Sequence, residues 1–235
     1  MDPRQLFSGP IRVGQPRETR RHKGLSRAWI RCPSGRRLDL LDPAPTDVEI
    51  GDIALALSRI CRWAGMTRTR YGFSVAQHSV LVLDLMDWML REDGDLRALA
   101  AHSKLGVRGW RLAGLLHDGA EAYLGGDLAS PAKAHLEADG YKAMEDRLQR
   151  AINLRFALPA TLPGRLKTLI KAADRASAYA ESVLIAGFSR AEADPLFGIR
   201  TPLAEGASLD PLPPEAAESL FLQRFAELDP GSRAA

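Results

Sequence analysis

Apolar residues recur at intervals of three and four along most of the chain, which is the spacing of one buried face of an α-helix. The helices that this pattern predicts cover residues 50–63, 75–90, 96–102, 108–122, 136–156, 165–188 and 214–228. Capping-box sequences precede two of them, Thr46-x-x-Glu49 and Ser74-x-x-Gln77. Long helices with short connections indicate a helical bundle whose site is built from side chains on facing helices.

The N-terminal and C-terminal parts depart from this pattern. Two short apolar runs within residues 28–40 flank Pro33-Ser34-Gly35, which predicts a β-hairpin, and residues 189–213 are expected to form a loop. The predicted fold class is therefore all-α, a helical bundle with a small N-terminal β-hairpin. The predicted parts are a basic flexible arm (1–27), the hairpin and a linker (28–45), the helical core (46–188), and a C-terminal loop and helix (189–235).

Charge is concentrated at the N-terminus. Residues 1–37 carry ten Arg and Lys residues against two acidic residues, a local charge of +8, so the remainder carries about −5 of the net +3. Such an arm can contact nucleic acid or bring anionic substrates near. Only Phe7 and Trp29 could stack on bases there, so a solvated arm is favoured and nucleic acid is not the expected partner.

The remaining composition points to the cytoplasm. Cys32 and Cys61 form neither a disulfide framework nor a metal knuckle and are expected to be free thiols in a reducing compartment. The most apolar stretch, residues 80–90, is broken by Asp84 and Asp87, so no membrane partner is expected. The N-terminus also lacks the apolar segment of a secretory signal.

The candidate chemistry begins at the end of an apolar helix, in RLAGLLHDGAEAYLGGDLASPAK. The run 112–116 predicts a buried helix, and the following His117-Asp118 pair would leave a charge unmatched in the interior unless a cation met it. Imidazole and carboxylate are ligands that suit divalent transition metals. Glu121 follows at a spacing that lets it share a helix face with the pair.

Two more helices offer ligands of the same kind. His78 falls on the apolar stripe of the 75–90 helix, and Asp174 falls on a small, apolar face of the 165–188 helix. Taken alone, His78 could be a hydrogen-bonded core histidine and Asp174 the partner of an arginine. Together with His117 and Asp118 they make two imidazoles and two carboxylates, which would bind one divalent ion and leave positions for water and substrate.

This set resembles a known signature. His78, His117-Asp118 and Asp174 match the H…HD…D pattern of the HD-domain metal-dependent phosphohydrolases, most closely the small 5'-deoxynucleotidase branch (the YfbR-like proteins). The surrounding sequences SVAQHS, LLHDGAEAYLGGDLASPAK and IKAADRASAYAES agree as well. The resemblance covers residues 47–181 and implies an HD-domain helical bundle for the core.

The resemblance also implies roles. One metal ion would be held by the four signature residues, and Glu121 would act as the catalytic acid/base. Arg62-Trp63 match an Arg-Trp pair that contacts the phosphate and base region. Asp127 is expected to be both a catalytic and a substrate-binding residue, since it matches an aspartate that helps select a sugar lacking the 2'-hydroxyl. The chain departs from the family there, because Asp127 stands six residues after Glu121 rather than five, with Gly125-Gly126 between.

Further substrate contacts are expected from Gln77 and, more weakly, from Lys133 and Arg70. Each has an ordinary alternative: Gln77 is the last residue of a capping box, and the cations can be solvated surface charges. Glu121 could likewise orient a histidine rather than transfer a proton.

The expected function is a metal-dependent phosphohydrolase that releases phosphate from nucleotides, deoxynucleoside 5'-monophosphates first. Within the enzyme class, a dNTP (tri)phosphohydrolase is the alternative. In another class stands a non-catalytic HD protein that binds nucleotides or nucleic acid. The ligand set does not separate Mn, Co, Fe, Ni and Zn. The resemblance implies a homo-oligomer, most simply a dimer.

Overall fold

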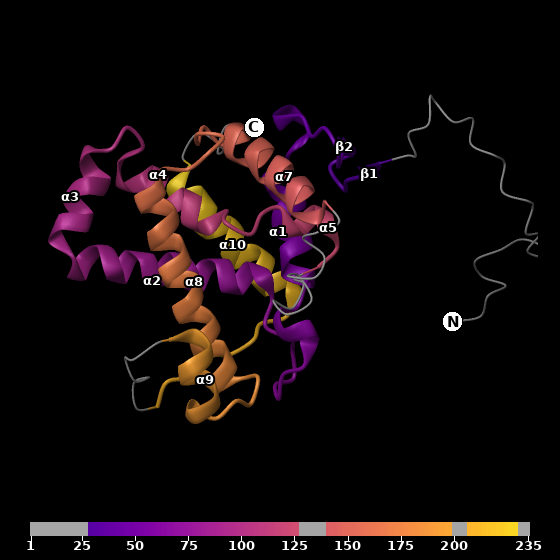
Figure 1. The fold of residues 1–235 in the computed structure, drawn as a ribbon. Coiled ribbons are helices and arrows are strands. Elements are labelled where there is room, and N and C mark those ends of the chain that lie inside the picture. The colour runs from indigo at the N-terminus through magenta and orange to yellow at the C-terminus, as the bar shows by residue number, and fades with distance from the viewer. Residues whose placement is uncertain (1–27, 127–139, 199–205, 230–235) are drawn as a thin grey trace, which may run out of the picture.

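The structure, a computed structural model, describes residues 28–126, 140–198 and 206–229. These residues are mostly helical, and a small antiparallel sheet near the N-terminus completes them (Figure 1). This confirms the all-α class with a hairpin. None of the described helices combines the length and apolarity that crossing a bilayer requires. The arm predicted for residues 1–27 lies outside the described residues.

Helix α2 (Val75–Glu92) organises the rest. It packs against α1 (Ile50–Arg59), α4 (Gly106–Leu115), α8 (Gly164–Leu184) and α10 (Pro214–Leu228), and Figure 1 shows α8 crossing it near its middle. Helices on several sides explain why the first turn of α2, from residue 75 to residue 80, is buried throughout. Any polar side chain in this turn must therefore find its partners inside the protein.

The helix begins where its sequence predicts. Ser74 is the N-cap residue, and its side chain accepts a hydrogen bond from the backbone amide of Gln77 (3.2 Å). The side chain of Gln77 does not complete the box. It instead accepts from the amide of Leu212 (2.9 Å) and donates to the carbonyl of Asp210 (3.1 Å), which fixes the segment before α10.

The N-terminal hairpin is confirmed. Strand β1 (Trp29–Arg31) pairs antiparallel with β2 (Arg37–Asp39). The turn between them is attached to α1, because the amide and hydroxyl of Ser34 both bind the carboxylate of Asp52, at 2.9 and 2.5 Å. Leu38 of β2 is fully buried, so the hairpin shares the core of the helices.

The remaining elements are shorter or peripheral. They are the helices α3 (Gly94–His102), α5 (Glu121–Leu124), α7 (Tyr141–Arg155) and α9 (Arg190–Phe197), and the 3₁₀ turns η2 (Pro45–Asp47) and η3 (Arg62–Gly65). Helix α9 packs on α8, and α5 lies between α1 and α7. Both cysteines are free, as expected.

The capping box predicted at Thr46-x-x-Glu49 is wrong. Glu49 itself is the N-cap residue of α1 and makes no side-chain cap. Its carboxylate instead binds Arg36 of the hairpin turn (2.8 Å) and Arg155 at the end of α7 (3.4 Å). The helix also ends at Arg59 rather than near residue 63, because the backbone becomes extended at Ile60 and Cys61 then forms a β-bridge with Ser74.

Two other helix predictions need correction. The helix expected over 108–122 is interrupted: α4 ends at Leu115, and in the following turn the amide of His117 bonds the carbonyl of Gly114 (3.4 Å), three residues back rather than four. His117 and Asp118 therefore lie in a turn and do not share one helix face with Glu121. The predicted loop 189–213 contains α9, which begins with a complete capping box.

Candidate metal centre

Three of the predicted ligands meet at one point. His78 comes from the first turn of α2, Asp174 from the middle of α8, and His117 from the turn after α4. The nearest ligand atoms of these three side chains all lie within 4.8 Å of one another. His78 is fully buried, and the other two are half-buried, so the group lies at the edge of the core and could hold a metal ion.

Asp118 lies beside this group. Its Oδ2 is 3.1 Å from Nε2 of His117 and 3.4 Å from Nε2 of His78, while Oδ1 of Asp174 is 3.2 Å from the same His78 nitrogen. Ligand atoms at roughly 2.0–2.2 Å from one ion lie about 3 Å apart. These three distances are of the size found between atoms bound to one ion, although only His78, His117 and Asp174 meet the mutual distance of 4.8 Å.

Both imidazoles are oriented to offer Nε2. Nδ1 of His78 is 2.6 Å from the carboxylate of Glu181, and Nδ1 of His117 is 2.9 Å from the carbonyl of Gly114. Because these partners accept a hydrogen bond, each Nδ1 carries the proton, and Nε2 is the nitrogen that can bind a metal. Neither buried Nε2 has a hydrogen bond of acceptable geometry within the described residues. The donor set therefore fits a divalent ion.

Electrostatics in the group favour the charged forms of His78 and Asp118. Burial and Arg62 both lower the pKa of His78, but Glu181 and the two aspartates outweigh them and raise it well above its usual range. Burial alone would raise the pKa of Asp118, yet the neighbouring His117 and His78 bring it well below normal. Glu181 and the two aspartates therefore stabilise positive charge on the imidazole of His78.

Glu181 is a site residue that the sequence analysis did not predict. It lies seven residues after Asp174 on α8 and is fully buried. Besides Nδ1 of His78, its Oε1 accepts the hydroxyl of Ser177 (2.7 Å). Burial would raise the pKa of Glu181, but His78 and Arg62 hold it far below its usual range. The spacing of three and seven from Asp174 places these residues on one face of a predicted helix, a signal that the sequence did contain.

The Arg62-Trp63 pair also meets Glu181. Nε of Arg62 and Nε1 of Trp63 both donate to its Oε2, at 3.2 and 2.9 Å. The indole further packs against the rings of Phe188 (5.6 Å between centroids) and Phe197 (6.4 Å). Their contact with phosphate and base remains a prediction. Both side chains do bind the same carboxylate that accepts from Nδ1 of His78.

Comparison with known proteins identifies relatives but no activity. The chain is 47% identical to an uncharacterised protein of Rhodobacter capsulatus over 201 residues, which is 85% of this chain and 95% of the relative. It is 31% identical to the uncharacterised protein YfdR of Escherichia coli over 208 residues, 86% of this chain and 96% of YfdR. The chain belongs to the family of these two proteins. Profiles of known protein families give no match. The site's own chemistry must therefore support any function.

The other predicted site residues are placed as follows. Glu121 is buried at the first position of α5, and its amide donates to the carbonyl of Asp118 (3.0 Å), so it follows the ligand turn directly. The side chain of Gln77 is engaged with the 210–212 segment, and Arg70 lies exposed over the ring of Tyr71. Asp127 and Lys133 lie outside the described residues.

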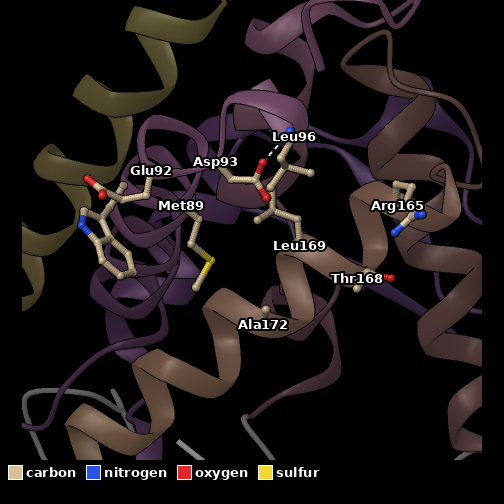
Figure 2. Close-up of a pocket in the computed structure, with 9 residues that line it drawn as sticks. Met89, Glu92, Asp93, Leu96, Arg165, Thr168, Leu169 and Ala172 are labelled. Carbon is tan, nitrogen blue, oxygen red and sulfur yellow. Dashed lines mark hydrogen bonds between the residues drawn. The ribbon is translucent and has the colours of Figure 1, made fainter. Parts of the chain in front are cut away.

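A pocket of about 370 Å³ lies elsewhere, between the end of α2, the start of α3 and α8 (Figure 2). Its lining is mostly apolar, with Met89 and Leu169 facing it, and Arg165 at one side. Asp93 at its rim is already used, because it caps α3 by accepting the amide of Leu96 (2.9 Å). Of the predicted metal and substrate residues that the structure describes, none lines this pocket.

Proposed function

We propose that the chain is an HD-domain metal-dependent phosphohydrolase that releases phosphate from nucleotides, deoxynucleoside 5'-monophosphates first. The observation that carries the proposal is the pair of buried imidazole nitrogens, Nε2 of His78 and Nε2 of His117, facing two carboxylates at 3.1 to 3.4 Å. A histidine bound to a metal almost always donates its other ring N–H to an acceptor, and both Nδ1 atoms have one here.

The proposed ligand set is His78, His117, Asp118 and Asp174, around one divalent transition metal ion. Two carboxylates and two neutral imidazoles balance its charge, and fewer ligands than an octahedron needs leave room for water and substrate. A bound ion of this kind supplies a polarised phosphoryl oxygen and an acidified water, which suits hydrolysis of an anionic phosphate ester.

The protein's own groups supply the rest. Glu121, buried and one turn beyond Asp118, would take a proton from the attacking water and return one to the leaving oxygen. Arg62 is placed at the edge of the same cluster by its bond to Glu181, and its guanidinium would bind the substrate phosphate. The half-buried indole of Trp63 would contact the base.

The first test is product analysis. Protein stripped with a chelator and reloaded with Mn²⁺ or Co²⁺ is given dNMPs, NMPs and dNTPs side by side, and phosphate, pyrophosphate and triphosphate are measured. Phosphate released from dNMPs alone supports the proposal. Silence on every nucleotide with metal still bound contradicts it and favours a non-catalytic HD protein.

A single substitution tests the acid/base role. Glu121→Gln keeps the size of the side chain but removes its ability to accept and return a proton, so we expect hydrolysis to fall by roughly 10²–10⁴-fold. Metal binding should remain, because Glu121 is not a proposed ligand. The matched control is Glu215→Gln, which changes an exposed carboxylate on α10 and should leave both quantities unchanged. Retained hydrolysis in Glu121→Gln would remove Glu121 from the mechanism.

One observation favours the longer phosphate chain as an alternative. The segment 62–70 carries Arg62, Arg68 and Arg70, and more cations suit a triphosphate better than a monophosphate. Release of triphosphate, or of phosphate in steps, from dNTPs would move the proposal to a dNTP phosphohydrolase.

A further inference from the structure

We propose that Glu181 is a positioning residue that holds two parts of the site at once, the ligand His78 and the Arg62-Trp63 turn. The inference rests on the proposed metal site for its first half only. Its second half concerns the turn and applies with or without a bound ion.

The two carboxylate oxygens of Glu181 bind different parts of the site. Within the described part of the chain, Oε1 accepts from His78 and Ser177, while Oε2 accepts from Arg62 and Trp63. The carboxylate is fully buried, so water does not compete for these bonds. The residues meet from distant parts of the chain, since Trp63 and Glu181 are 118 positions apart.

Only a carboxylate satisfies this arrangement. Glutamine has the same shape but one of its two terminal atoms becomes an NH₂ group, which donates and cannot accept. If that group faces His78, the imidazole must move its proton to Nε2 and loses the lone pair that would bind a metal. If it takes the place of Oε2 instead, it opposes the N–H groups of Arg62 and Trp63. Either orientation breaks one half of the site.

The turn held by Oε2 is strained, which explains why it needs an anchor. Trp63 and Ala64 have φ values of 59° and 52°, in the left-handed region that side chains other than glycine rarely adopt. Such conformations persist only when surrounding contacts fix them. The bond from the indole to Glu181, with the packing of Phe188, provides that fixation.

The first arm of the test measures metal binding. Wild type, Glu181→Gln and the control Glu215→Gln are titrated with Co²⁺ alone, followed by its visible absorption, and circular dichroism verifies the fold. We expect Glu181→Gln to bind Co²⁺ roughly 10–100-fold more weakly, the usual cost of losing the partner of a metal-bound histidine, and to show an altered spectrum. Ser177→Ala, which removes one neutral donor, should weaken binding by a smaller factor. It carries this arm if the glutamine variant does not fold.

The second arm follows Trp63 in the metal-free protein. Its fluorescence is isolated by making Trp63→Phe in wild type, in Glu181→Gln and in Glu215→Gln. The spectrum of each protein that lacks Trp63 is then subtracted from that of the same protein with Trp63. We expect Glu181→Gln to shift and weaken this contribution, and Glu215→Gln to leave it unchanged. A wild type that fails to bind Co²⁺ overturns the metal site and the first half of the inference. A wild type that binds Co²⁺, with a folded Glu181→Gln variant matching it in affinity, spectrum and fluorescence, overturns the role of Glu181 alone.

Discussion

Gly114 sets how closely α4 approaches α2, and replacing it by alanine should separate the two helices. A Cβ at this position would overlap the sulfur of Met86 and lie 3.1 Å from its terminal methyl carbon. Met86 is fully buried, so it has little space into which to move. Overpacking of this kind costs about 1–3 kcal/mol. Alanine in a helix interior returns about 1 kcal/mol of backbone preference, so we expect Gly114→Ala to destabilise by about 1 kcal/mol.

A double-mutant cycle isolates the steric part. Met86→Ala alone removes buried atoms and should cost roughly 2–5 kcal/mol. In that background the new methyl group at position 114 no longer collides, so Gly114→Ala should stabilise by about 1 kcal/mol and reverse its sign. The coupling between the two positions would then be about 2 kcal/mol. Urea unfolding of the four proteins, monitored by circular dichroism, gives each term.

The control and the refutation are direct. Gly51 lies in the first turn of α1, and a Cβ there would meet no atom within 4 Å. Gly51→Ala should therefore leave the free energy of unfolding unchanged or raise it by up to about 1 kcal/mol. If Gly114→Ala destabilises equally with and without the Met86 side chain, contact between α2 and α4 does not explain the glycine. Co²⁺ affinity should also depend on this helix contact, because α4 leads into His117 and α2 carries His78. Gly114→Ala should weaken Co²⁺ binding, and adding Met86→Ala should partly restore it.

Two further outcomes are expected. Metal binding should tighten as the pH rises above about 6.5, the ordinary pKa of histidine, and should release protons. Burial and Arg62 lower the pKa of His78, but Glu181 and the two aspartates outweigh them and raise it well above its usual range, and the proton on Nε2 must leave before a metal binds. Calorimetry in two buffers of different ionisation enthalpy checks this, and pH-independent binding without proton release would contradict it. Asp52→Ala should cost about 1–3 kcal/mol, because it removes the acceptor of both Ser34 bonds and frees the hairpin, whereas Ser34→Ala should cost less. Urea unfolding and hydrogen exchange of the strands measure it, and protected strands with unchanged stability would refute it.

Local sequence was sufficient where one residue decides an element. The serine at position 74 places the start of α2, and hence places His78 in the first buried turn, as predicted. The range predicted for the last helix, 214–228, agrees with α10. The start of helix α9 carries the same kind of signal, since Ser189 and Glu192 form a capping box, but the sequence analysis predicted a loop there.

Contacts across the fold decided the elements that local patterns misplaced. The turn after α4 lies close to α7. A Cβ at Gly119 would lie 3.2 Å from Cδ1 of Ile152 on α7 and 3.1 Å from the carbonyl oxygen of Leu116. Periodicity alone continues a helix through such a point. Glu49 likewise has a helix-capping spacing, yet cations brought by the hairpin and α7 bind its carboxylate.

The cluster of His78, His117, Asp118 and Asp174 depends both on local sequence and on contacts across the fold. Its candidate side chains could be predicted, and so could the helices of His78 and Asp174, because a histidine or an aspartate on an apolar stripe needs a polar partner or a metal ion inside the protein. Their orientation could not, since it depends on which acceptor reaches each Nδ1: a carbonyl three residues before His117, and the carboxylate of Glu181 far from His78 in sequence. If the group binds a metal as proposed, the carboxylate of Glu181 therefore contributes to binding without being a ligand. It turns a buried histidine, which could have packed like any core residue, into one that presents Nε2 beside Asp118 and Asp174.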